Sequence, residues 1–97
     1  SVYRVKLSVQ RFESWPASHA LIGAVWSVRA LSEEAVLTCR SVVSEPVGAG
    51  NDALVAGHRQ ALQQIAANVA DGIRALDAAA RAHRLVRGQA APPCPAQ

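Results

Sequence analysis

One long amphipathic segment constrains the fold more than any other feature of the chain. Between residues 52 and 87, large apolar side chains recur at helical spacing and share a stripe about 120° wide. The stripe consists of Leu54, Val55, Leu62, Ile65, Val69, Ile73 and Leu76, with His58 among them. An isolated helix of this kind is marginal in water and gains its stability by docking. The sequence therefore predicts a helix over 52–87, packed on the rest of the chain.

The ends of this helix have their own signals. Asn51 and Asp52 are both good N-cap residues, and an aspartate also suits the positive end of the helix dipole. Gly88 is a suitable C-cap. We therefore expect a single domain over residues 1–88, followed by a disordered Ala/Pro/Gln tail at 89–97.

Three segments with the period of β-strands precede the helix. Residues 2–12 alternate between apolar and polar side chains, with Phe12 on the polar side of the pattern. Residues 19–31 are apolar on both faces, as in a central strand covered from two sides. Residues 35–44 alternate again. Because the connections are short, the three strands should form an antiparallel meander.

The fold class is therefore α+β, a two-layer arrangement of a three-stranded meander and one long helix, within a larger mixed sheet. The predicted structural core consists of Phe12, Trp26, Leu54, Leu62, Ile65 and Val69. One helix covers one face of the sheet, which leaves Leu21, Val25 and Leu31 of the central strand without a cover. We expect upstream strands and a helix, or another subunit, to supply it.

The charge of the chain argues against most nucleic-acid binding modes. The formal net charge is only +3, Lys6 is the single lysine, and the sequence has no run of basic residues. A weak attraction to an anionic lipid surface fits the charge equally well. No signal peptide opens the chain, and no apolar run approaches the ~18 residues of a membrane-spanning helix. We expect this chain itself to be soluble.

The two cysteines do not predict a metal site. Cys39 and Cys94 form no CxxC pair, and no histidine stands at ligand spacing from either. Cys39 fits a small buried hydrophobe, whereas Cys94 belongs to the proline-rich tail. A disulfide between them is compatible with an oxidising compartment, and the sequence leaves that pairing open.

No catalytic constellation is present, and we expect neither an enzyme nor a cofactor. Glu33 and Glu34 fit a solvated turn better than a paired-carboxylate site. His58 fits a histidine at the edge of the core better than a base or a ligand. The stretch 48–51 fits a flexible loop better than a phosphate-binding loop, because it lacks the third glycine and the Lys-Ser/Thr pair.

Two surfaces are candidates for contact with a partner or a lipid. Four arginines of the helix, Arg59, Arg74, Arg81 and Arg84, fall within about 80° of one another. The simpler interpretation is that these arginines form a solvated face of the helix. The more specific one is that they bind an acidic partner or anionic lipid headgroups. Leu21 and Val25, on the uncovered face of the central strand, form the second surface.

Two sets of residues carry a resemblance to a known family. The stretch Val9-Gln10-Arg11-Phe12-Glu13, followed by Leu21, Ala24 and Trp26, resembles the "V-x-R-F … L-x-A-x-W-x-L" strand pair of PqiC-like proteins, the ABC-type transport auxiliary lipoproteins. The helix pattern Ala53-Leu54-Val55-Ala56, with Ala61-Leu62, Ile65-Ala66 and Val69-Ala70, resembles the helix of the same family. The order and approximate spacing agree over residues 2–73.

The resemblance implies a compact α/β domain that faces the periplasm and is anchored by lipid to the outer membrane. Family members accompany MCE-domain proteins and an ABC permease that move lipids between membranes. It implies no catalytic residue. The upstream half that would carry the acylated cysteine is not in this sequence, so the anchor is expected in a longer precursor. We also expect homo-oligomers. The alternative function is a binding domain for an anionic ligand or nucleic acid, through the arginine face.

Overall fold

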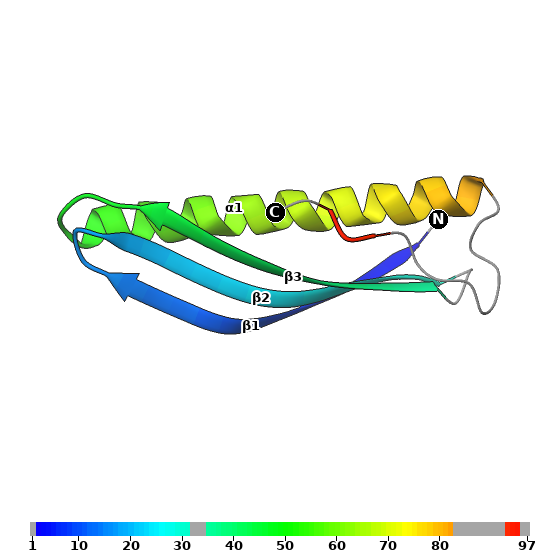
Figure 1. The fold of residues 1–97 in the computed structure, drawn as a ribbon, viewed down its shortest axis with the longest axis horizontal. Coiled ribbons are helices and arrows are strands. Elements are labelled where there is room, and N and C mark those ends of the chain that lie inside the picture. Colours follow the sequence, from blue (N-terminus) through cyan, green and yellow to red (C-terminus); the bar gives the residue numbers. More distant parts are fainter. Residues whose placement is uncertain (1, 32–34, 83–92, 96–97) are drawn as a thin grey trace.

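Two layers make up the structure, a sheet and a single long helix that lies along it (Figure 1). The computed structural model describes residues 2–31, 35–82 and 93–95. The elements are β1 (Tyr3–Trp15), β2 (His19–Ala30), β3 (Ala35–Pro46) and α1 (Asn51–Arg81). The strands pair antiparallel in the order β1-β2-β3. The predicted α+β class, with a three-stranded meander and one C-terminal helix, is confirmed.

Two of the strands continue further than the alternation predicts, whereas β2 ends at Ala30 instead of 31. β1 continues to Trp15 instead of ending at residue 12, and β3 continues to Pro46 instead of 44. The connection between β1 and β2 is tight: the Ser18 amide donates to the Trp15 carbonyl at 2.9 Å, and Ala17 has a φ of 56°. This close turn fixes the pairing of Trp15 with His19, and the β1–β2 register follows from it as far as Arg11.

A β-bulge in β1 corrects the sequence-based placement of Phe12. The pairing register shifts between Val9 and Arg11, so that one residue of β1 has no counterpart on β2. Beyond the shift Phe12 pairs with Ile22, whose side chain lies on the same face of the sheet as Trp26. Phe12 therefore points to the helix side of the sheet and not to the polar side that strict alternation predicts.

The core lies between α1 and the face of β2 and β3 that carries Trp26. The largest fully enclosed side chains there are Trp26, Ile22, Ile65 and Leu76. α1 can approach this closely because it carries glycine at the contact. A Cβ on Gly72 would lie 2.6 Å from the Trp26 ring, so only glycine fits at this point of the helix.

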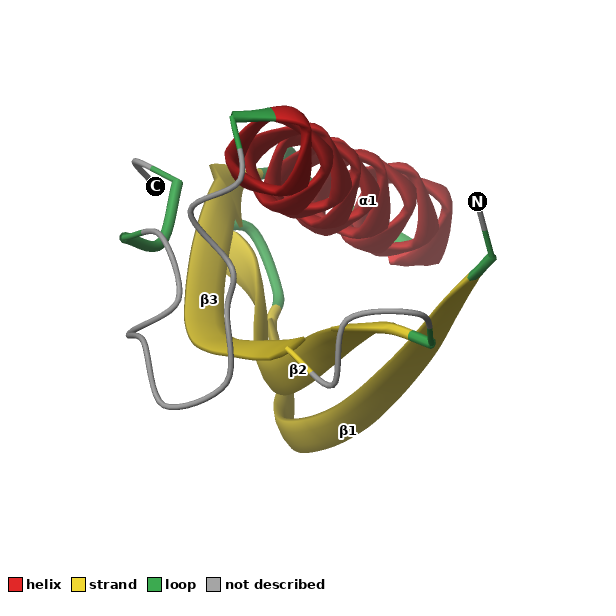
Figure 2. Cartoon of the chain, turned by 90° about the vertical axis from the view of Figure 1, so that its right-hand side faces the viewer, coloured by secondary structure: helices red, strands yellow, loops and turns green. Residues whose placement is uncertain are grey.

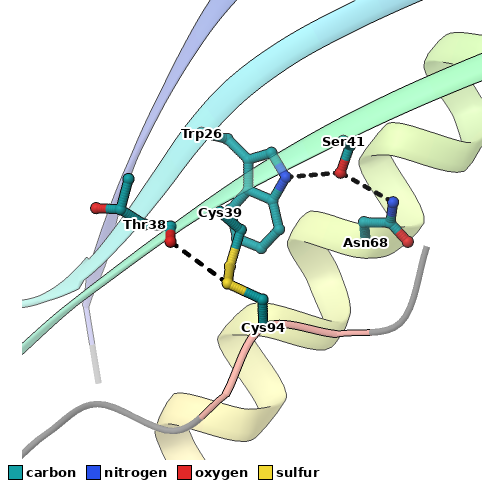
Figure 3. The surroundings of a disulfide bond; sticks show 6 residues. All are labelled: Trp26, Thr38, Cys39, Ser41, Asn68 and Cys94. Atoms are coloured by element: carbon teal, nitrogen blue, oxygen red, sulfur yellow. Dashed lines mark hydrogen bonds between the residues drawn. A yellow bond between two sulfur atoms is a disulfide. The ribbon is translucent and has the colours of Figure 1, made fainter.

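A buried hydrogen-bond network crosses the core beside Trp26 (Figure 3). The Trp26 Nε1–H donates to Ser41 Oγ at 2.9 Å, and Asn68 Nδ2 of α1 donates to the same oxygen at 3.0 Å. Ser41 is 1% exposed. One hydroxyl on β3 thus satisfies the indole of β2 and an amide of the helix together.

Two of the predicted core residues are not buried, and that part of the core prediction is wrong. Phe12 is 61% exposed and Leu62 is 46% exposed, while Leu54 and Val69 are half-buried. The reason is the position of the helix, which lies over β2 and β3 and touches β1 little (Figure 2). The helix side of β1 and the flank of α1 above it remain uncovered by the described residues.

The helix ends differ from the predicted caps. Gly50, with a φ of 98°, is the N-cap, and no side chain caps the helix, so neither Asn51 nor Asp52 holds that role. At the other end α1 stops at Arg81, and the Ala82 amide donates back to the Ala78 carbonyl. Residues 83–87 of the predicted helix, and the expected cap at Gly88, lie outside the described residues.

Candidate functional site

The helix arginines are partly neutralised by their neighbours. Arg74 donates to Asp71 at 2.9 Å and Arg81 to Asp77 at 2.8 Å, the (i, i+3) and (i, i+4) geometries that a helix favours. Arg59 is exposed near the start of α1, and Arg84 lies outside the described residues. The three described arginines are thus exposed on α1, and two of them share their charge with acidic residues of the same helix.

The other predicted surface, Leu21 and Val25, lies on the open face of the sheet. Both residues belong to the side of β2 that turns away from α1, and both are half-buried. The strand residues beside them, including Val42 of β3, are partly exposed. Among the described residues no element covers this face (Figure 1).

Sequence reasoning missed a cluster of cations at one end of this open face, the basic cluster of Arg4, Lys6 and Arg29. Arg4 pairs directly with Arg29 across the β1–β2 ladder, and Lys6 lies two residues along from Arg4 on the same face. All three are exposed. They line a hollow of about 170 Å³ together with Ser27 and Val36. A register counted from the β1–β2 turn would pair Arg4 with Ala30, and only the bulge near Val9 brings Arg4 opposite Arg29, so the sequence carried no clear signal for this cluster.

A second, apolar surface runs between β1 and α1; we call it the β1–α1 groove. One part, of about 400 Å³, is lined by Val5, Leu7, Leu62, Ile65, Ala66 and Val69. The adjoining part, of about 530 Å³, shares Leu62 and includes Phe12 and Val55. The exposed fractions of Val5, Leu7 and Val55 are 44%, 47% and 57%. Neighbouring apolar side chains exposed to this degree mark an interaction surface more often than isolated ones do.

His58 lies at the end of this groove, where it joins α1 to β1. Its Nε2 is 2.9 Å from Ser14 Oγ, and its ring stacks on Phe12 with the centroids 4.0 Å apart. His58 is 8% exposed, and its Nδ1 has no partner among the described residues. A serine–histidine pair needs a third group to orient the imidazole for nucleophilic catalysis, and the described residues provide none.

The two shifted carboxyl groups belong to structural pairs on the surface. The Arg81 guanidinium and the Tyr3 hydroxyl lower the pKa of Asp77, since both donate to the ionised carboxylate. Arg11 and the Trp15 indole lower the pKa of Glu13 in the same way. Neither carboxyl has the raised pKa of a general acid. In the described ranges no three His, Cys, Asp or Glu side chains gather to hold a metal ion.

Cys39 and Cys94 are joined by a disulfide (Figure 3). Their Cα atoms are 5.8 Å apart, and 55 residues separate them in the sequence. The bond holds residues 93–95 of the predicted disordered tail beside β3. The pairing that the sequence left open is thus present in the structure, and it is of the kind that persists in oxidising compartments.

The family model of the ABC-type transport auxiliary lipoprotein component matches residues 1–70. The chain belongs to this family. The match spans all three strands and the first twenty residues of α1, from Asn51 to Ala70. It therefore includes the basic cluster and every residue that lines the β1–α1 groove. The resemblance read from the strand pair and the helix pattern is confirmed.

No match is found among curated proteins or among solved structures. The family description associates the chain with an ABC-type transport system, and the word lipoprotein in it indicates the cell envelope. In the described part of the chain, no helix is both long and apolar enough to span a bilayer. Asp77 and Cys94 lie beyond the residues that the auxiliary lipoprotein model matches.

Proposed function

We propose that this chain is a non-enzymatic auxiliary component of an MCE/ABC-type lipid transport system, working in the periplasm between the inner and outer membranes. Its partners would be an MCE-domain protein and the ABC permease, and a lipid anchor in a longer precursor would attach it to the outer membrane. The observation that carries the proposal is the family match over residues 1–70. The Cys39–Cys94 disulfide supports it, since such bonds persist in the periplasm.

The β1–α1 groove is the surface we assign to the protein partner. Its apolar side chains are exposed along both β1 and the flank of α1. Within the described part of the chain, β1 pairs with β2 alone, so its outer edge keeps free backbone donors and acceptors. An extended segment of a partner could pair with this edge and place alternate apolar side chains in the groove.

Co-purification from solubilised envelopes tests the proposal. Leu62→Asp puts a charge into the groove at a side chain that is 46% exposed, so the fold should tolerate it. The matched control is Gln63→Asp, one residue further along the exposed side of α1. We expect the MCE-domain protein to co-purify with the wild type and the control and to be lost with Leu62→Asp. Equal recovery with both variants would remove the groove from the interface, and no recovery with the wild type would refute the partner.

Self-association is the competing use of the same groove. Sedimentation of the wild type, Leu62→Asp and Gln63→Asp separates the two cases. An oligomer that dissociates only with Leu62→Asp, together with unchanged co-purification of the MCE-domain protein, would assign the groove to a second copy of this chain.

The alternative function, binding of an anionic ligand or nucleic acid through the helix arginines, has weaker support. Arg74 and Arg81 each share their charge with an aspartate of α1. Counterion release from nucleic acid needs several unpaired cations along one face. No contact of the described residues favours this function over the transport role.

A further inference from the structure

We propose that the basic cluster of Arg4, Lys6 and Arg29 is a binding site for a phosphate group, on the open face of the sheet and separate from the β1–α1 groove. The inference goes beyond the proposed function and does not depend on it, because the ligand is defined by its chemistry. A phosphate group can be presented by a lipid headgroup or by a free phosphate, and the experiment below distinguishes the two.

Like charges lie next to one another in the basic cluster. Arg4 and Arg29 are direct partners in the β1–β2 ladder. Directly opposed residues on one face have Cβ atoms about 4.5–5.5 Å apart, and like charges in such positions destabilise a sheet. Lys6 is the diagonal neighbour of Arg29, about 7–8 Å away. The three cationic side chains are therefore close neighbours that repel one another. A bound phosphate dianion would remove this repulsion.

No side chain of the described residues neutralises the basic cluster. The side chains of Arg4, Lys6 and Arg29 make no hydrogen bond or ion pair with any residue of the described ranges. The other charged residues of β1 do have partners: Arg11, on the same open face, forms an ion pair with Glu13 at 2.7 Å. Charge on this face is thus compensated at one end of β1 and concentrated at the other.

The hollow between the cations has a shape and a lining that suit a phosphate group. It is bounded by Ser27, which faces Lys6 across the ladder, and by Val36, which faces Arg29 on β3. Its volume of about 170 Å³ exceeds the ~30 Å³ of a water several-fold, so an oxyanion has room. Guanidinium forks suit phosphate oxygens geometrically, and the Ser27 hydroxyl adds a neutral donor.

Apolar and polar side chains are mixed on the same face beyond the cluster. Val36, 42% exposed, borders the cluster, and Val25 lies half-buried further along β2, with Thr38 and Arg40 of β3 beside it. A phosphate that carries an acyl chain could bind its charged end at the cluster and lay its apolar part on Val36 and Val25. Inorganic phosphate would use only the charged end.

Two probes, inorganic phosphate and vesicles, test the site with the full chain. The variant is Arg4→Gln/Arg29→Gln, and the matched control is Arg59→Gln/Arg74→Gln, which removes the same charge from α1. We expect phosphate to raise the wild-type and control melting temperatures saturably and to leave the cluster variant unchanged. Vesicles of phosphatidylglycerol and phosphatidylcholine should bind the wild type and the control at least tenfold more tightly than the cluster variant, with pure phosphatidylcholine as the neutral comparison.

The outcomes separate the sources. Selective loss of vesicle binding in the cluster variant supports a lipid-borne phosphate, whereas a selective phosphate effect without vesicle binding supports the site with a free phosphate. Equal losses in both variants would show that binding depends on the overall charge of the protein, and this would overturn the proposal.

A second experiment measures stability without any ligand. Arg29→Gln should raise the melting temperature by about 1–5 °C, because it relieves the repulsion between Arg29 and its cationic neighbours. A decrease would show that the cluster is already neutralised, and would also overturn the proposal.

Discussion

The indole of Trp26 packs directly against the backbone of Gly72, and a Cβ on that glycine would lie 2.6 Å from the ring. Trp26 is 1% exposed and cannot move away, since Ser41 holds its Nε1–H at 2.9 Å. The distance between α1 and the sheet is therefore set by this contact. The packing of the core therefore depends on glycine at position 72 as much as on Trp26.

Gly72→Ala should destabilise the protein although alanine is the better helix former. The gain in helix propensity is about 1 kcal/mol, and the cost of overpacking is about 1–3 kcal/mol, so we expect a net loss of up to about 2 kcal/mol. Urea unfolding measures it. The control is Gly48→Ala, whose Cβ would meet nothing within 4 Å. A Gly72→Ala variant that gains the full ~1 kcal/mol of helix propensity would mean that α1 docks further from Trp26.

Ser41→Ala should cost about 1–3 kcal/mol, because it removes the acceptor shared by the Trp26 indole and the Asn68 amide. Trp26→Ala should cost more, about 3–5 kcal/mol, through the cavity it leaves. A double-mutant cycle with Ser41→Ala and Trp26→Phe isolates the hydrogen bond. Additive effects in that cycle would contradict the bond, whereas coupling between the two positions is the expected result.

Reduction of the Cys39–Cys94 disulfide should lower stability by about 4 kcal/mol, the loop-closure value for a bond that spans 55 residues. Melting of the wild type with and without dithiothreitol gives the measurement. Cys94→Ser provides the control, since its stability should be low in both conditions and indifferent to the reductant. A wild type that melts identically with and without reductant would show that the bond does not form in solution.

Acid should weaken the contact that joins the start of β1 to α1. Arg81 and Tyr3 lower the pKa of Asp77 in the folded protein. The contact therefore stabilises the fold fully above the unfolded pKa of about 3.9, and this contribution is lost as the pH falls through the lower folded pKa. We expect melting temperatures to fall less steeply from pH 5 to pH 2 in Asp77→Asn than in the wild type. Parallel curves would contradict this.

Much of the fold could be predicted because each element has a strong local period. The alternation around Tyr3–Val9 and the stripe from Leu54 to Leu76 gave the meander and the helix correctly. Phe12 could not be placed, because a single unpaired residue near Val9 moves every later side chain of β1 to the other face. Leu62 was misplaced because periodicity shows which residues share a stripe, but not how much of the stripe the sheet covers.

The site was harder to predict because it depends on pairs of strands. Arg4 and Arg29 are 25 positions apart, and only the β1–β2 register makes them neighbours. The disulfide is a similar case, since the fold alone brings Cys94 to Cys39. The resemblance to the auxiliary lipoproteins was visible earlier because it rests on local hydrophobic patterns, which a single strand or helix displays by itself.

The disulfide also changes what a break in the chain would do. It makes a covalent ring of residues 39–94, which contains all of α1 and most of β3. A protease that cuts one peptide bond inside this ring releases no fragment, and the product is the intact mass plus one water until the bond is reduced. In a protease-rich compartment, one cleavage would leave the helix covalently attached to its own sheet, either through β3 or through the disulfide.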